Sequence, residues 1–150
     1  MTWLDRLKSW RSRPAGDEFI VIDRRSGILK IGTHLLSPST TPRDLPSLFA
    51  LTPESPMKVL RDVVQIRFAT ARISDHNDAV EVTLRFEQAA LVGCFFNIDP
   101  GAADPFRAHA EWLNRKLGVV DGAYTRFSWG IAGVVTDKSG GVHIFGHNRN

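Results

Sequence analysis

Apolar and polar residues alternate along much of the chain, and this two-residue period predicts β-strands. The clearest case is AVEVTLRF at residues 79–86, in which four apolar residues share one face while charged and polar residues share the other. We therefore expect one face of that strand in the core and the other in solvent. Alternation or short apolar runs predict further strands at 19–22, 28–31, 58–73, 91–99, 126–136 and 142–147.

Turn-forming residues separate these strands. DRRSG at 23–27, SDHND at 74–78 and DKSGG at 137–141 are rich in the residues that tight turns require. Strands joined by tight turns run antiparallel. A Pro-rich stretch at 37–56 interrupts the pattern, and Thr41 followed by Pro42 predicts a short helix there.

One longer helix is predicted at 104–117. Asp104 is suited to cap its start, and Gly118 is suited to end it. The apolar residues that recur at helical spacing form a stripe of Phe106, Ala110, Leu113 and Leu117, flanked by His109 and Trp112. We expect an α+β fold, in which an antiparallel sheet of about six or seven strands carries this helix on one face.

A second helix is predicted at residues 1–13. Trp3, Leu7 and Trp10 fall on one side of this segment, and basic residues occupy much of the rest. Such an amphipathic helix can dock on the body at 18–147, bind a partner, or make weak contact with an anionic membrane surface. Chain length predicts a single domain over 1–150.

The basic character of the chain is local. The net charge is +3, and residues 1–13 carry four basic side chains against one acidic side chain. The remaining 137 residues carry 15 of each sign. Because a nucleic-acid-binding domain spreads Lys and Arg along one face, we expect no nucleic-acid partner.

The compartment predicted from the sequence is the cytoplasm. Cys94 is the one cysteine and lies in an apolar run, so we expect a buried thiol and no intramolecular disulfide. No run of about 18 apolar residues is present, so we expect no transmembrane segment. We also expect no secretory signal, since no apolar region follows the basic N-terminus.

No group of residues predicts a catalytic, metal or cofactor site. His143 and His147 are four residues apart on a predicted strand, which separates them by roughly 13 Å. Two ligands of one zinc ion each lie about 2 Å from the metal, so this spacing does not suit zinc. The nucleophile motif Gly-x-Ser-x-Gly and the phosphate loop Gly-x-x-x-x-Gly-Lys are absent.

Two aromatic or titratable residues have alternative interpretations. Trp129 beside Gly130 is typical of core packing. Trp is also a frequent anchor at protein interfaces, so Trp129, Trp3 and Trp10 are the candidate interface residues. His109 is expected to be a hydrogen-bonded neighbour of the helix stripe, and its alternative role is in a pocket between helix and sheet.

The second half of the chain resembles a recurring pattern in small proteins of Gram-negative bacteria. The resemblance covers roughly residues 80–146 and is carried by Trp112-Leu113, Leu117-Gly118, Trp129-Gly130, and Asp137 with its Lys-Ser-Gly turn. Some of these proteins lie near secreted antibacterial toxins and are suspected cognate immunity proteins. The resemblance implies a non-catalytic protein that binds a toxin, and it implies no catalytic residue. The alternative function is a small-ligand-binding protein or enzyme with a pocket between helix and sheet.

Overall fold

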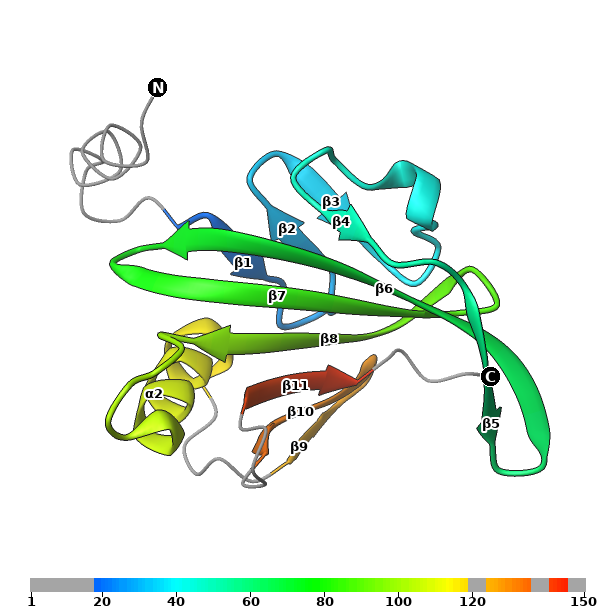
Figure 1. The fold of residues 1–150 in the computed structure, drawn as a ribbon. Coiled ribbons are helices and arrows are strands. Elements are labelled where there is room, and N and C mark those ends of the chain that lie inside the picture. The colour runs from blue at the N-terminus through cyan, green and yellow to red at the C-terminus, as the bar shows by residue number, and fades with distance from the viewer. Residues whose placement is uncertain (1–17, 119–123, 136–140, 146–150) are drawn as a thin grey trace.

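The computed structural model describes residues 18–118, 124–135 and 141–145. In that part of the chain the fold is mostly antiparallel sheet with one α-helix (Figure 1). The predicted helix at 1–13 lies outside the described residues.

The strands form two sheets, so the predicted single sheet of six or seven strands is wrong. The smaller sheet has the order β1-β2-β3. The larger sheet has the order β4-β6-β7-β8-β11-β10-β9, and β5 also pairs with β6. The strands of the small sheet are β1 (Ile20–Ile22), β2 (Leu29–Ile31) and β3 (His34–Leu36). Those of the large sheet are β4 (Ala50–Leu51), β5 (Ser55–Val59), β6 (Asp62–Asp75), β7 (Asp78–Glu87), β8 (Ala90–Ile98), β9 (Thr125–Phe127), β10 (Gly130–Val135) and β11 (Gly141–Phe145).

Two of the predicted strands are each divided by a turn. The predicted strand 58–73 is a hairpin, in which Leu60 and Arg61 connect β5 to β6. The predicted strand 126–136 is likewise divided into β9 and β10 by a turn at Ser128 and Trp129. Neither turn was predicted, because Leu-Arg and Ser-Trp are not the Gly-, Asn- or Asp-containing pairs that mark tight turns.

The Pro-rich segment contains the predicted helical turn as a 3-10 helix, η1 (Pro42–Asp44). Asp44 Oδ2 accepts hydrogen bonds from Thr41 N and Thr41 Oγ1, both at 2.9 Å. The side chain of the third helical residue thus reaches back to the cap, as in a capping box.

The helix α2 (Pro105–Leu117) confirms the prediction for 104–117. Asp104 accepts a hydrogen bond from Arg107 N at 3.2 Å, and Gly118 ends the helix in the left-handed conformation. The buried side, however, consists of His109, Trp112, Leu113 and Leu117, while Phe106 is exposed. The helix is rotated from the predicted stripe, because His109 and Trp112 have polar partners on the sheets.

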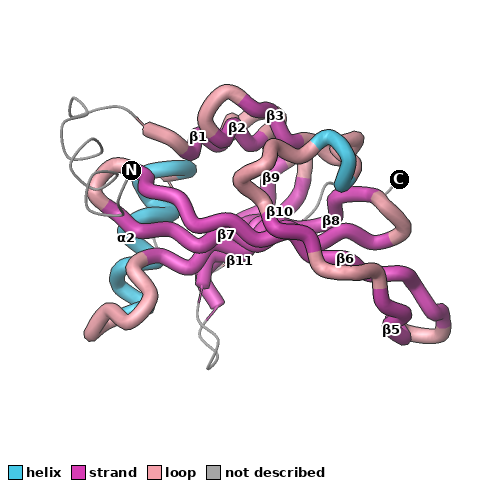
Figure 2. Tube along the Cα trace, turned by 45° about the horizontal axis from the view of Figure 1, so that its top comes forward, coloured by secondary structure: helices cyan, strands magenta, loops and turns pink. Residues whose placement is uncertain are grey.

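One hydrophobic core joins both sheets and the helix. It includes Ile20 and Ile31 from the small sheet, Val82 and Phe96 from the large sheet, and Trp112 from α2. The helix lies at one end of the large sheet, while the hairpin of β5 and β6 projects at the other end (Figures 1 and 2). Along β7, apolar and polar residues alternate between buried and partly exposed positions, as predicted.

Candidate functional site

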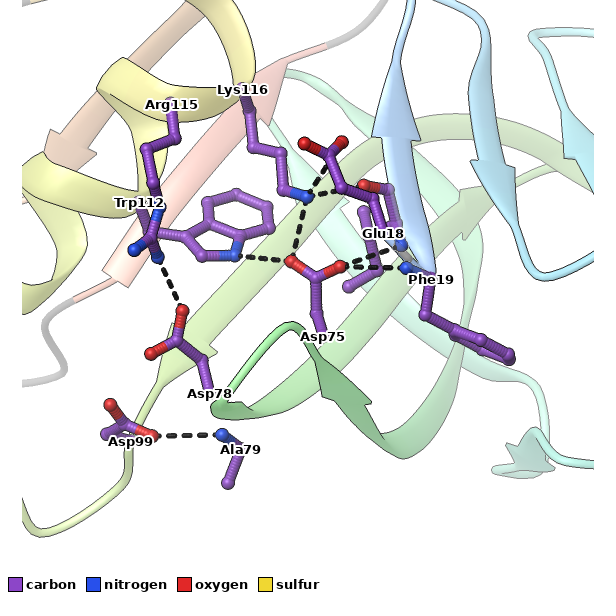
Figure 3. A network of polar contacts seen from close by, with 10 residues as sticks. Glu18, Phe19, Asp75, Asp78, Ala79, Asp99, Trp112, Arg115 and Lys116 are labelled. Atoms are coloured by element: carbon purple, nitrogen blue, oxygen red, sulfur yellow. Dashed lines mark hydrogen bonds and ion pairs between the residues drawn. The ribbon is translucent and has the colours of Figure 1, made fainter. Parts of the chain in front are cut away.

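Asp75 and His109, each 1% exposed, are the most deeply buried polar residues of the described structure, and the carboxylate of Asp75 lies at the end of β6. Its Oδ1 accepts hydrogen bonds from the backbone N–H groups of Phe19 and Ile20, both at 3.0 Å. Its Oδ2 accepts from Trp112 Nε1 at 3.0 Å and lies 2.8 Å from Lys116 Nζ (Figure 3). Four donors fill the acceptor capacity of the carboxylate, so this buried charge is fully hydrogen-bonded.

Lys116 is equally saturated. Its ammonium group donates to Ile20 O at 2.6 Å and lies 3.4 Å from Glu18 Oε2, in addition to the ion pair with Asp75. It also lies 5.5 Å from the centre of the Trp112 ring. A lysine has three N–H donors, and three oxygen atoms surround this one.

The Asp75 cluster, comprising Glu18, Asp75, Trp112 and Lys116, is therefore a structural clasp. It ties α2 and the start of β1 to the end of β6. Asp75 is 1% exposed and the Lys116 side chain 2% exposed, so neither charge is open to a substrate.

His109 is also engaged in structural contacts. Its Nε2 accepts a hydrogen bond from Ile98 N at 3.0 Å, which places the ring proton on Nδ1, facing Pro105 O. Burial lowers the pKa of His109, so the ring is neutral at pH 7. With both nitrogens hydrogen-bonded to the backbone, this ring is a poor candidate for general base or metal ligand.

A second acidic group lies beside the clasp, at the start of β7. Asp78 makes an ion pair with Arg115, and Asp99 Oδ1 accepts a hydrogen bond from Ala79 N at 2.9 Å (Figure 3). Burial raises the pKa of Asp78, and the neighbouring carboxylate of Asp99 raises it further, while Arg115 opposes both effects. Within the described residues no group of three or more His, Cys, Asp and Glu is arranged to hold a metal ion.

Cys94 is buried as predicted. Loss of solvent raises the pKa of its thiol to about 12, so the reactive thiolate is essentially absent at neutral pH.

Trp129 lies in the turn before β10 and packs against the core. Its Nε1 donates to Arg24 O at 2.8 Å, and its ring stacks on Phe127 at 4.9 Å between centroids. It covers Gly27, where an added Cβ would lie 2.4 Å from the indole. With 7% of the residue exposed, Trp129 offers little surface to a partner.

The other residues singled out from the sequence are not brought together with Trp129. Trp3, Trp10 and His147 lie outside the described residues. The backbone of His143 pairs with Gly133 and Phe95 in the large sheet.

The surface feature that sequence reasoning missed is the projecting hairpin, residues 55–65, which we call the arm. Because β7 ends opposite Ile66, residues 62–64 of β6 pair only with β5, and Gln65 also accepts a hydrogen bond from Gln88 N. The arm is thus a two-stranded ribbon, a structure that is marginally stable in water by itself. Its apolar side chains are nevertheless in solvent: Met57 is 43%, Leu60 92% and Val63 63% exposed.

The root of the arm is held firmly to the sheet. Thr52 donates its N–H to Phe68 O at 2.9 Å, and Thr52 Oγ1 accepts from Phe68 N at 3.0 Å. Arg67 Nε donates to Thr52 O at 2.7 Å, and Gln88 N donates to Gln65 O at 2.9 Å. These contacts fix the direction in which the arm projects.

Comparison with protein-family models, with curated proteins and with solved structures finds no match to this chain. In the part of the chain that the structure describes, no helix has the length and apolar character needed to cross a membrane.

Proposed function

We propose that this chain is a non-catalytic protein-binding protein and that the arm makes the principal contact with its partner. The supporting observation is that three large exposed apolar side chains, Met57, Leu60 and Val63, lie on this one projection. Two further exposed leucines, Leu48 and Leu51, precede the arm in the chain, and Leu51 lies in β4, which pairs with β6. Clustered exposure of this kind is typical of interaction sites, whereas scattered apolar residues are normal on any surface.

The arrangement of titratable groups supports binding over catalysis. Asp75, Lys116 and His109 each use their polar atoms in contacts that hold secondary structure together. A general base needs a free lone pair within reach of a substrate proton, and a nucleophile needs an approach path. The pocket between helix and sheet that was the alternative prediction is therefore less well supported, since Trp112, Leu113 and Leu117 fill the helix side of it.

In its specific form the proposal is that the partner is a bacterial toxin and that this chain is its cytoplasmic immunity protein. The resemblance of residues 80–146 to suspected immunity proteins supports this form. A projection with an apolar tip and a root fixed to the sheet suits occlusion of a concave active site, because its direction is set before it enters a cleft.

The experiment compares affinity capture by three forms of the full chain. Wild type, the arm variant Met57→Ser/Leu60→Ser/Val63→Ser, and the control Leu35→Ser are tagged and exposed to a native extract. Leu35 is 65% exposed and lies in β3, away from the arm, so this control tests whether any exposed leucine recovers proteins by non-specific binding.

We expect a protein that is recovered by wild type and by Leu35→Ser but not by the arm variant. Purified from its own gene, that protein should bind wild type directly, and toxicity on its expression should be relieved by wild type and by Leu35→Ser but not by the arm variant. Equal recovery by all three forms would contradict the arm as the binding site. A captured protein without toxicity would contradict the immunity function while leaving the binding function intact.

A further inference from the structure

The tip of the arm has a backbone conformation that its residue does not favour. Leu60 and Arg61 form a two-residue connection between Val59 and Asp62, and Leu60 has a φ of 57°. At such a position in a hairpin, Gly, Asn and Asp predominate, because a side chain with Cβ crowds the backbone when φ is positive.

Leu60 differs from the other residues of this conformation. The further non-glycine residues with positive φ in the described structure are His76, Gln88, Ala89 and Asp99. All of these are polar or small, as expected for turns. Leu60 alone is a large aliphatic residue, and it is 92% exposed.

The position of Leu60 is thus unfavourable in two ways, and no contact within the described structure compensates for them. Its backbone is strained and its side chain is in water, yet it makes no contribution to the core. A glycine would relieve the strain and remove the exposed apolar area. Strain that persists at a surface position is commonly linked to function.

The edge of the arm also indicates how a partner is recognised. β5 is an edge strand, and Pro56 lies within it. Proline cannot donate a backbone hydrogen bond, so it discourages another strand from extending the sheet along this edge. Pro56 therefore disfavours strand addition along β5, and the exposed side chains at the tip are the features left for recognition on that side of the arm.

The charges near the tip define the chemistry of the complementary surface. Lys58 and Arg61 are exposed, and neither is in an ion pair in the described structure. Asp62 is the one acidic residue between positions 58 and 63, so this stretch carries two basic groups against one acidic group, a net charge of +1. Such a tip suits an apolar pocket whose rim carries carboxylates.

We infer that Leu60 is the anchor of the arm and inserts into an apolar pocket of a partner protein, with Lys58 and Arg61 facing acidic residues at the pocket rim. This inference rests on the proposed binding function and adds the anchor and the chemistry of the site that receives it.

The test is site-specific photo-crosslinking in cells of the native organism. The photoreactive residue p-benzoylphenylalanine replaces Leu60 or Val63 in the arm, or Leu35 or Phe106 as exposed controls. We expect adducts with one other protein from positions 60 and 63 only. The crosslinked peptide of that protein should contain apolar residues flanked by Asp or Glu.

Substitutions at the tip complete the test. With the photoreactive residue at 63, Leu60→Gly should lower adduct yield at least about tenfold, as expected for an anchor residue. The thermal midpoint of Leu60→Gly should equal or exceed that of wild type, because glycine accepts positive φ. A Lys58→Glu/Arg61→Glu variant should lower the yield as strongly, and Leu35→Gly should leave it unchanged.

The outcomes separate the inference from the proposed function. Adducts from positions 35 or 106 but not from 60 would overturn the anchor and leave protein binding standing. An absence of adducts at all four positions would overturn both. An adduct of two copies of this chain, or a crosslink to lipid, would overturn the assigned partner. A Leu60→Gly protein that unfolds at a lower temperature than wild type would show that Leu60 has a structural role.

Discussion

Removal of the Lys116 ammonium group should strongly destabilise the fold. In Lys116→Met the aliphatic stem is retained, while Asp75 loses its ion-pair partner and stays buried. Breaking one side of a buried ion pair typically costs about 3–5 kcal/mol, because the other charge is left uncompensated. Three donors to the carboxylate remain, from Phe19 N, Ile20 N and Trp112 Nε1, so we expect a value of about 3 kcal/mol, near the lower end of that range.

Such a loss is large for a protein of this size. Domains are stable by only about 5–15 kcal/mol in total. At about 2–4 °C for each kcal/mol, the thermal midpoint should fall by roughly 6–12 °C. Guanidinium unfolding of wild type and variant, followed by circular dichroism, measures the difference in the free energy of unfolding directly.

A matched control and a double variant make the test specific. Lys58→Met, on the exposed arm, should change stability by less than about 0.5 kcal/mol. Asp75→Asn/Lys116→Met should be more stable than the sum of the two single losses implies, since the amide carries no charge to leave unpaired. A cost below about 1 kcal/mol for Lys116→Met, or simple additivity in the double variant, would refute the assignment of this pair as a clasp.

Three further predictions concern other positions. Gly27→Ala should destabilise by more than about 2 kcal/mol in chemical denaturation, because its φ is 72° and the new Cβ would collide with Trp129; an unchanged midpoint would contradict this packing. Asp78→Asn should leave stability at pH 7 unchanged or raised, since the raised pKa of Asp78 means that folding disfavours its charged form. The stability that the protonated form of Asp78 contributes is complete below its unfolded pKa and is lost as pH rises through its folded pKa. A marked loss of stability at pH 7 in the variant would contradict this direction. Folding favours the neutral form of His109, because burial lowers its pKa. The resulting stability is present above about pH 6.5 and is lost as pH falls toward the pKa of His109 in the folded protein. The stability of wild type should therefore fall between pH 7.5 and 5.5, and a similar fall in His109→Gln would assign the effect to another group.

The sequence was most informative where structure is specified locally. Asp104 and Gly118 bound the helix because capping and a left-handed end depend on residues within a few positions. The hairpin β1–β2 followed from two short apolar runs on either side of DRRSG, and the hairpin β7–β8 followed from the alternation in 79–86 and the apolar run after it. These features need no knowledge of distant contacts.

The division into two sheets and the rotation of α2 could not be predicted in the same way. Asp75 is 55 residues from Ile20 and 37 residues from Trp112 along the chain. Alternation identifies the buried face of a strand but not the neighbour beside it. The sequence predicted His109 and Trp112 at the edge of the helix stripe. Their hydrogen-bond partners lie on β8 and β6, and the spacing of residues within the helix cannot identify these strands.

The arm was missed for a different reason. Its turn is made by Leu60 and Arg61, which lack the conformational preference that normally marks a hairpin. Local rules fail here because the tip residue departs from them, and such departures concentrate at functional positions. One signal was available: Val59, Leu60, Val63 and Val64 interrupt strict alternation.

β6 connects the two ends of the molecule as a single strand of 14 residues. At about 3.3 Å per residue, it spans up to roughly 45 Å between the tip of the arm and Asp75. Glu18, the first residue described, lies beside Asp75 and Lys116 at the far end. Substitutions at the tip and substitutions in the Asp75 cluster are therefore much farther apart than the roughly 7–10 Å within which their effects would couple, so their effects on the free energy of unfolding should add.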